Sequence, residues 1–283
     1  MTLDTRDHDR GSAGLEYVYY VVSRRARGVS VGVNLNPNNA CNWRCVYCQV
    51  PNLTAGRAPA IDVPRLEREL AAVLTRVTAP SWLEAHAPQG SRRVADIAIA
   101  GNGEPTSARE LGEVLEAVAR QRAAAGLEAT CGLTLITNGS LAHQPHVQRA
   151  LERLAELGGE VWCKLDAGDD AGLARINSSA TGFARARRAL EHCATRCPTW
   201  VQTLVFDWGG PTLAGAALEQ YCAALRELRE AQRNHLRGVL LYGLARPSHQ
   251  PEAAQLRALP EGELQALGAA IARATGLEVR VSA

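Results

Sequence analysis

Three cysteines in one short segment are the residues of this chain best suited to chemistry. Cys41, Cys45 and Cys48 lie in the segment NLNPNNACNWRCVYCQV, with the spacing Cys-x3-Cys-x2-Cys. Three thiolates on one tight loop can hold three corners of a cubane iron–sulfur cluster, which normally takes four cysteines. The fourth iron then keeps an open coordination site, where a second cofactor can bind and react.

The alternative for the same loop is a zinc site. Structural zinc usually takes four ligands, often as two Cys-x2-Cys pairs. This loop offers three closely spaced cysteines without a neighbouring histidine, and the next cysteine along the chain is Cys131. The spacing therefore favours a [4Fe–4S] cluster with one open iron over zinc.

The cysteine loop resembles the motif of the radical S-adenosylmethionine (SAM) superfamily, in which an aromatic residue, here Tyr47, precedes the last cysteine. The resemblance implies that the open iron chelates SAM through its amino and carboxylate groups. Reductive cleavage of SAM would then give a 5′-deoxyadenosyl radical, which takes a hydrogen atom from the substrate. The protein would position and shield this radical, because the cofactor supplies the difficult chemistry.

A glycine-rich turn follows the second predicted strand. Gly101, Asn102, Gly103 and Glu104 resemble the Gly-Gly-Glu-Pro turn of the superfamily, with the asparagine in place of one glycine. The resemblance implies that this turn contacts the SAM ammonium group. An ammonium group needs acceptors, and glycines let the backbone come close. The other interpretation is an ordinary strand-to-helix loop in which Thr106 or Ser107 caps the next helix.

Polar residues on four further strands complete the predicted SAM site. Asn138 belongs to a strand end that resembles the superfamily's Thr-Asn-Gly, although Asn-Gly is also a common turn. Lys164 and Asp166 share one face of a strand in the interior. Burying a charge there is costly unless it pairs with an opposite charge or with a ligand. Their strand resembles a Leu-Asp-Ala end that reaches the SAM ribose or substrate; the alternative is a structural pair. Gln202 is either a SAM contact or a buried hydrogen-bonded residue, and Arg246 either binds a carboxylate or phosphate or lies on the surface.

Strand-like and helix-like segments alternate along the chain, as is typical of βαβ units and a parallel sheet. Six such units are too few for a closed eight-stranded barrel. We therefore predict an α/β fold, a partial, open (β/α)6-type barrel with parallel strands; the alternative is a doubly wound sheet. Both place an active site at the carboxyl ends of the strands, where these motifs fall. The predicted strands are Val29–Leu35, Val94–Ala100, Gly132–Thr137, Glu160–Leu165, Trp200–Phe206, Gly238–Tyr242 and, as a further candidate, Leu277–Val281. The predicted helices are Val63–Val77, Leu111–Ala125, Pro145–Leu157, Ala180–Cys193, Leu213–Gln232 and Glu261–Thr275, and Pro80–Arg93 is predicted as a surface loop.

Composition and termini narrow the class of protein. A net charge of +2 argues neither for nor against a nucleic-acid partner, which would need a local basic patch. No apolar run is long enough for a transmembrane helix, so no membrane partner is expected. Met1–Gly14 is polar and lacks the pattern of a signal peptide. We predict a disordered leader over residues 1–14, a single radical SAM domain over 15–283, and a cytoplasmic location in which the cysteines stay reduced.

Arginine-containing segments indicate a branch of the superfamily. Together with the cysteine loop, four features resemble small proteins grouped with the wyosine-synthesis enzymes, which act on a modified guanosine in transfer RNA: Ser23–Arg25, Gly28, Gly32–Leu35 and Ala245–Pro247. The resemblance to this branch gives a fold and not a substrate. We expect a small-molecule, nucleoside or tRNA substrate and an electron donor such as flavodoxin or ferredoxin. The arginines of Ser23–Arg27 would then bind phosphate or carboxylate, whereas the alternative is a solvated charge run.

Other functions stay open at this stage. The small size and Leu165–Ala167 also suit an activating enzyme that makes a glycyl radical on a partner protein. A non-enzymatic iron–sulfur sensor or electron carrier would not need the Gly101–Glu104 turn. A zinc-stabilised binding module would contain neither iron nor sulfide.

The remaining cysteines are predicted to hold no auxiliary cluster. Only Cys193 and Cys197 lie close together, at a helical spacing of four, and isolated cysteines often act as small buried apolar residues. Changing both to Ser should leave the iron content and the spin-resonance signal of the reconstituted protein unchanged. Loss of about four iron per chain, the content of one cubane cluster, would instead reveal a second cluster.

Overall fold

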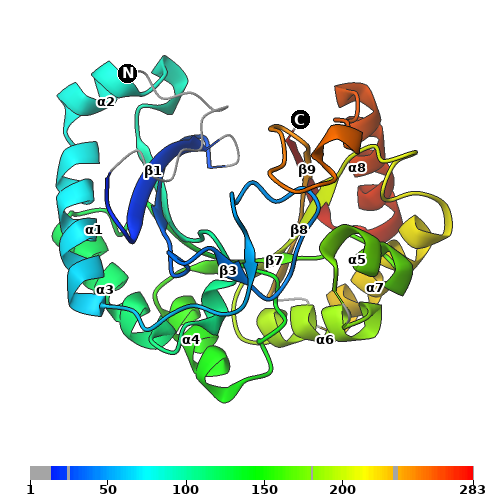
Figure 1. Cartoon of the computed structure of the whole chain (residues 1–283), viewed down its shortest axis with the longest axis horizontal. Coiled ribbons are helices and arrows are strands. Elements are labelled where there is room, and N and C mark those ends of the chain that lie inside the picture. The colour runs from blue at the N-terminus through cyan, green and yellow to red at the C-terminus, as the bar shows by residue number, and fades with distance from the viewer. Residues whose placement is uncertain (1–13, 24–25, 180, 232–234, 283) are drawn as a thin grey trace.

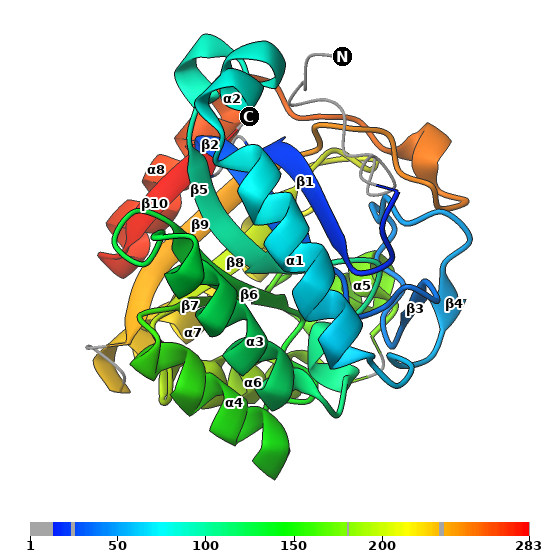
Figure 2. The same ribbon diagram turned by 90° about the vertical axis from the view of Figure 1, so that its left-hand side faces the viewer.

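Eight strands form one curled sheet in the part of the chain that the computed structural model describes, residues 14–23, 26–179, 181–231 and 235–282. The strand order is β1-β2-β5-β6-β7-β8-β9-β10, with β1 and β10 at the open edges (Figures 1 and 2). Neighbours from β2 to β10 run parallel, and β1 pairs antiparallel with β2. The predicted partial α/β barrel is confirmed, with seven parallel strands in these residues rather than six. The strands are β1 (Val18–Ser23), β2 (Gly28–Val33), β5 (Val94–Ile99), β6 (Gly132–Thr137), β7 (Glu160–Lys164), β8 (Thr199–Val205), β9 (Leu236–Gly243) and β10 (Glu278–Ser282).

Most helices cover the outer face of the sheet, and the loop that contains the three cysteines lies across the carboxyl ends of the strands (Figure 1). None of the described helices combines the length and the apolar character needed to cross a bilayer. The helices are α1 (Val63–Val77), α2 (Pro80–His86), α3 (Leu111–Ala124), α4 (Pro145–Glu156), α5 (Asp170–Asn177), α6 (Phe183–Ala194), α7 (Gly215–Ala231) and α8 (Glu261–Thr275). The short strands β3 (Ala40–Cys41) and β4 (Thr54–Ala55) pair within the cysteine loop.

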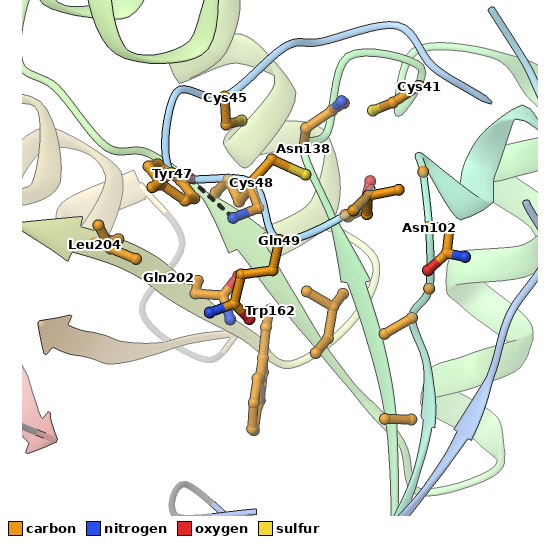
Figure 3. A pocket seen from close by; sticks show the side chains of 18 of the residues that line it. Cys41, Cys45, Tyr47, Cys48, Gln49, Asn102, Asn138, Trp162, Gln202 and Leu204 are labelled. Atoms are coloured by element: carbon orange, nitrogen blue, oxygen red, sulfur yellow. Dashed lines mark hydrogen bonds between the residues drawn. The ribbon is translucent and has the colours of Figure 1, made fainter. Parts of the chain in front are cut away.

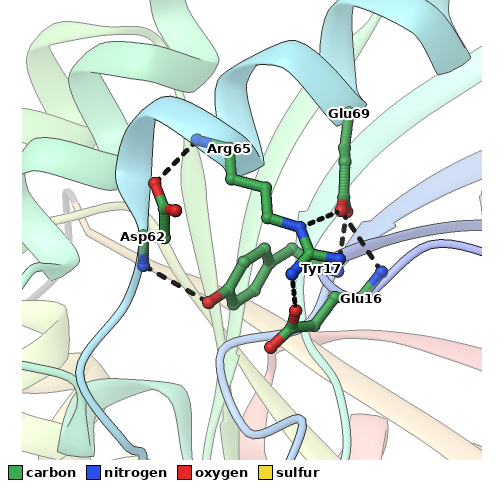
Figure 4. Close-up of polar contacts among 5 residues, drawn as sticks. All are labelled: Glu16, Tyr17, Asp62, Arg65 and Glu69. Carbon is green, nitrogen blue, oxygen red and sulfur yellow. Dashed lines mark hydrogen bonds and ion pairs between the residues drawn. The ribbon is translucent and has the colours of Figure 1, made fainter.

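A polar network joins the start of α1 to the segment before β1 (Figure 4). The Asp62 carboxylate caps α1 by accepting from the Arg65 backbone N–H at 2.9 Å. The Glu69 carboxylate accepts from the Tyr17 backbone N–H at 2.8 Å and from the Arg65 guanidinium at 3.0 Å, and Arg65 also pairs with Glu16. These contacts fix β1 over α1, so the antiparallel edge strand is part of the barrel wall.

Three elements differ from the sequence-based prediction. β1 was not predicted, although its first five residues, 18–22, are a continuous run of β-branched and aromatic residues. Pro80–Arg93, predicted as a loop, contains α2, because Pro80 lies in its first turn and Trp82 packs edge-on against Tyr20 with ring centroids 5.1 Å apart. α5 was missed because its eight residues are too few for a clear helical period.

Parts of several predictions lie outside the described residues, among them Ala180 and Gln232 at the ends of two predicted helices. The predicted leader falls there except for Gly14, and so do Arg24 and Arg25 of the arginine-rich segment.

Two glycines let the cysteine loop pack directly against the turn after β5. A Cβ atom on Gly101 would lie 2.1 Å from Asn34 Oδ1, and one on Gly103 would lie 2.0 Å from the Ala40 carbonyl oxygen. The resemblance to the superfamily's turn implies that these glycines let the backbone approach a ligand. The structure shows that they first allow close approach by the chain itself.

Gly101→Ala should therefore destabilise the protein. Overpacking of a filled site costs about 1–3 kcal/mol, and the clash includes the Asn34 backbone as well as its side chain. Thermal unfolding would measure the difference. Gly112→Ala is the matched control, because a Cβ there meets nothing within 4 Å and alanine favours the helix. Equal stability of both variants would contradict this account of the turn.

Candidate active site

A cavity of about 260 Å³ lies inside the open barrel, beneath the cysteine loop (Figure 3). Its walls come from β1, β2 and β5–β9 and from the loops that follow them. Of the predicted site residues, all but Asp166 line it, so one cavity gathers groups spread over some 200 positions of sequence. These residues are Cys41, Cys45, Tyr47, Cys48, Gly101, Asn102, Gly103, Glu104, Asn138, Lys164, Gln202 and Arg246.

The three thiols lie together on the roof of the cavity. Cys45 is buried, and Cys41 and Cys48 are partly exposed. Burial raises the pKa of the Cys41 thiol to about 12 and that of the Cys45 thiol to about 11. Without metal these two thiols are therefore protonated at neutral pH, and metal binding would release their protons.

Chain segments distant in the sequence hold the cysteine loop in place. The Ser248 hydroxyl lies 2.7 Å from the Val46 carbonyl oxygen and 3.0 Å from that of Cys48, and the His249 backbone N–H donates to Cys48 at 2.9 Å. Arg44 forms a bidentate ion pair with Glu252, both contacts at 2.8 Å. The buried hydroxyl supplies a hydrogen-bond partner to carbonyls of the loop, whereas a half-exposed ion pair contributes little stability.

Glu104 is buried at the ends of β5 and β6. Its Oε1 accepts from the Thr106 backbone N–H at 3.1 Å and from the hydroxyls of Thr106 and Thr137, and its Oε2 accepts from the Asn138 backbone N–H at 2.7 Å. Burial raises the pKa of the carboxyl, and these hydrogen bonds oppose the rise. An oxygen with two lone pairs and one such bond retains acceptor capacity, so Oε2 can also accept from a ligand.

The two predicted asparagines contact the cysteine loop. Asn138 Nδ2 donates to Asn42 Oδ1 at 2.8 Å, and Asn42 in turn donates to the Ser140 hydroxyl at 2.8 Å. Asn102 Nδ2 donates to Asn39 Oδ1 at 2.7 Å. In this state both amides therefore help to hold the roof of the cavity.

Tyr47 stands between Lys164 and Asp166. Lys164 Nζ donates to the Tyr47 hydroxyl at 3.0 Å and lies 5.0 Å from the ring centroid, and that hydroxyl donates to Asp166 Oδ2. Asp166 Oδ1 accepts from the Leu204 backbone N–H at 2.9 Å. Burial and the neighbouring carboxylate raise the pKa of Tyr47 well above its usual range, so it remains a donor. The structure thus gives the fully buried Asp166 protein partners, away from the cavity that the other predicted residues line.

Gln202 and Arg246 line the cavity from β8 and from the segment after the neighbouring strand β9. Gln202 is buried on β8 (Figure 3), and its Oε1 has no hydrogen-bond partner among the described residues. A buried acceptor of this kind needs a donor, so it points to a ligand. Arg246 Nη1 donates to Gln49 Oε1 at 3.2 Å, which ties the loop after β9 to the cysteine loop.

Two residues at the site, Trp162 and Asn177, were not predicted from the sequence. Trp162 forms part of the floor and donates to Glu160 at 2.8 Å; its period-two relation to Lys164 was the available signal. Asn177, at the end of α5, donates to Cys45 Sγ at 3.2 Å. No local pattern marks Asn177, because its neighbours lie far away in the sequence.

The residues present fit a cubane cluster with SAM beside it. Among the described residues, no group of three or more His, Cys, Asp or Glu side chains is arranged to hold a single metal ion. A cubane does not require such a group, since each cysteine binds a different iron. The spare capacity of Glu104 and the unpartnered oxygen of Gln202 supply acceptors in the same cavity.

Curated proteins of two bacteria are similar to part of this chain. Two UPF0026 proteins match, one of Synechocystis sp. at 31% identity over 171 residues and one of Helicobacter pylori at 30% over 139 residues. These matches cover 59% and 49% of this chain and 54% and 40% of the relatives, so the chain spans about half the length of these curated relatives or less.

Two solved structures are similar in fold. The structure of TYW1 with a lysine–pyruvate adduct bound has a TM-score of 0.52 at 14% identity, over 88% of this chain and 74% of that one. Streptococcus suis SuiB bound to the precursor peptide SuiA has a TM-score of 0.57 at 12% identity, over 89% and 48%. The family model described as "Radical SAM superfamily" matches residues 35–213, from the start of the cysteine loop to beyond β8. The chain therefore belongs to the radical SAM superfamily.

Proposed function

We propose that this chain is a radical SAM enzyme whose Cys41, Cys45 and Cys48 hold a [4Fe–4S] cluster and whose cavity binds SAM. The observation that supports it best is that the three thiols, the Glu104 turn and Gln202 face one cavity at the carboxyl ends of parallel strands. When bound, the cluster and SAM supply the one-electron chemistry that generates a 5′-deoxyadenosyl radical.

The chain's own residues bind and orient SAM in this proposal. Glu104 Oε2 accepts from the ammonium group, and Gln202 Oε1 accepts from a donor on the ribose or adenine. Ile136, Trp162 and Leu204 line the wall below the thiols and keep water away from the radical. Asp166 acts indirectly, because its carboxylate binds Tyr47 and the backbone of β8.

The proposed substrate is a nucleoside, free or within transfer RNA. The resemblance to the wyosine-type branch supports this choice, and the Arg246 guanidinium on the cavity wall suits a phosphate or carboxylate. An electron donor such as flavodoxin or ferredoxin would reduce the cluster, and a cytoplasmic location would supply both donor and substrate.

Anaerobic incubation with SAM, dithionite and guanosine or unfractionated transfer RNA tests the proposal. We expect about four iron and four sulfide per chain, as in one cubane cluster, and formation of 5′-deoxyadenosine detected by mass spectrometry. Cys41→Ala, Cys45→Ala and Cys48→Ala should each abolish SAM cleavage, whereas Cys131→Ala is the control that should retain it. A triple Ala variant that still binds the full cluster would refute the assignment.

Glu104→Gln should keep the cluster and weaken SAM binding. Loss of a hydrogen bond to a charged group costs about 1.5–3 kcal/mol, or roughly tenfold to a hundredfold in affinity. Titration of SAM, followed by the change in the cluster's spin-resonance signal, measures the affinity. Glu113→Gln, on the exposed side of α3, is the control. An unchanged affinity in Glu104→Gln would remove this carboxylate from the SAM site.

A further inference from the structure

The side-chain amide of Asn177 makes two hydrogen bonds that converge on the cysteine loop. Its Nδ2 lies 3.2 Å from Cys45 Sγ and 2.8 Å from Asp166 Oδ2. An amide nitrogen carries two hydrogens, so each of these acceptors receives one. Asn177 is fully buried, so water does not compete for these two hydrogen bonds.

Asp166 fixes which end of the amide faces the sulfur. If the nitrogen and oxygen of Asn177 were exchanged, Oδ1 would face a carboxylate oxygen at 2.8 Å, which is repulsive. Asp166 cannot turn away, because it also accepts from the Leu204 backbone and from Tyr47. An N–H group is thereby held against Cys45.

α5 and the cysteine loop are joined at the same place. The Val46 backbone N–H donates to the Ile176 carbonyl oxygen at 2.8 Å, next to both partners of the N–H···S contact. At the other end of α5 the Asp169 side chain caps the helix by accepting from the Gly172 N–H at 2.6 Å. The distance between Asn177 and Cys45 is thus set by the backbone as well as by the side chains.

We propose that Asn177 is a positioning residue that raises the reduction potential of the cluster through its hydrogen bond to the Cys45 sulfur, with Asp166 orienting it. This inference rests on the proposed function. Reduction adds negative charge, which spreads onto the cysteine sulfurs, so a fixed N–H dipole stabilises the reduced cluster more than the oxidised one. Hydrogen bonds to sulfur are among the factors that set the potentials of such clusters.

Asn177 differs from the other groups near the sulfurs. The Trp43 backbone N–H lies 3.5 Å from Cys41 Sγ, a longer contact that no side-chain substitution removes. Within the described ranges, Asn177 is the side chain that donates to one of the three sulfurs. Cys45 is also the one buried cysteine of the three, where a single dipole acts with little screening by water.

The experiment is an anaerobic redox titration of reconstituted protein, without SAM, followed by the spin-resonance signal of the reduced cluster. We expect Asn177→Leu to shift the reduction equilibrium about tenfold toward the oxidised cluster, which is 59 mV more negative for one electron. Asn177→Ser, too short to reach both acceptors, should shift it in the same direction. Asn38→Leu is the matched control, because Asn38 belongs to the same loop but donates to the Arg57 carbonyl oxygen.

The outcomes separate this inference from the proposed function. Wild-type protein that assembles no four-iron cluster would refute both. A wild-type cluster whose potential is unchanged in both Asn177 variants would refute the inference alone. Loss of iron from both variants would assign Asn177 to cluster retention and would also overturn it, whereas a full iron content with a lowered potential supports it.

Discussion

Two buried carboxylates hold the cysteine loop and the ends of four strands in one arrangement. Burying an ionised carboxylate is costly unless donors surround it. Glu104 receives four hydrogen bonds, which join the end of β5 to the end of β6. Asp166 receives three, from the cysteine loop, α5 and β8. Each carboxylate therefore links several chain segments through its hydrogen bonds. Removal of a single donor would leave the negative charge of that carboxylate poorly compensated.

The cysteine loop depends on such contacts with other segments because it has little regular structure of its own. Its backbone groups must find partners, and they find them in Ser248 and His249 after β9, in Ile176 of α5 and in the two-residue pairing of β3 with β4. Ser248, His249 and Ile176 all lie more than 100 positions further along the chain than the loop. The three thiols are consequently placed by the whole barrel, which makes the roof of the cavity preorganised for a rigid ligand.

The sequence predicts features that depend on a short segment, and it does not predict contacts between residues that are distant in the chain. Residues 63–77, 132–137 and 261–275 match their predicted elements to the residue, because hydrophobic period and capping are properties of short segments. The period of two also placed Lys164 on the inner face of β7. It could not reveal that Tyr47 would separate Lys164 from Asp166, or that α5 would bring Asn177 to Cys45, since those distances are fixed by tertiary packing.

The electrostatics of the site involve the one lysine of the chain. Lys164 is the only lysine among the 31 lysine and arginine residues of the chain, and it lies in the cavity, where it donates to the Tyr47 hydroxyl that in turn binds the buried Asp166. Burial is the main cause that raises the pKa of Cys45; Asp166 adds to the rise, and Lys164 opposes it. An arginine would carry the same charge, but its planar guanidinium is larger and needs several acceptors in one plane. A compact ammonium 3.0 Å from the Tyr47 hydroxyl can offset the charge of Asp166 and of thiolates without filling the space that a ligand must occupy. At position 164 a compact ammonium therefore suits the site better than a planar guanidinium. It places positive charge near Asp166 and the cysteines, and it leaves the cavity below them open.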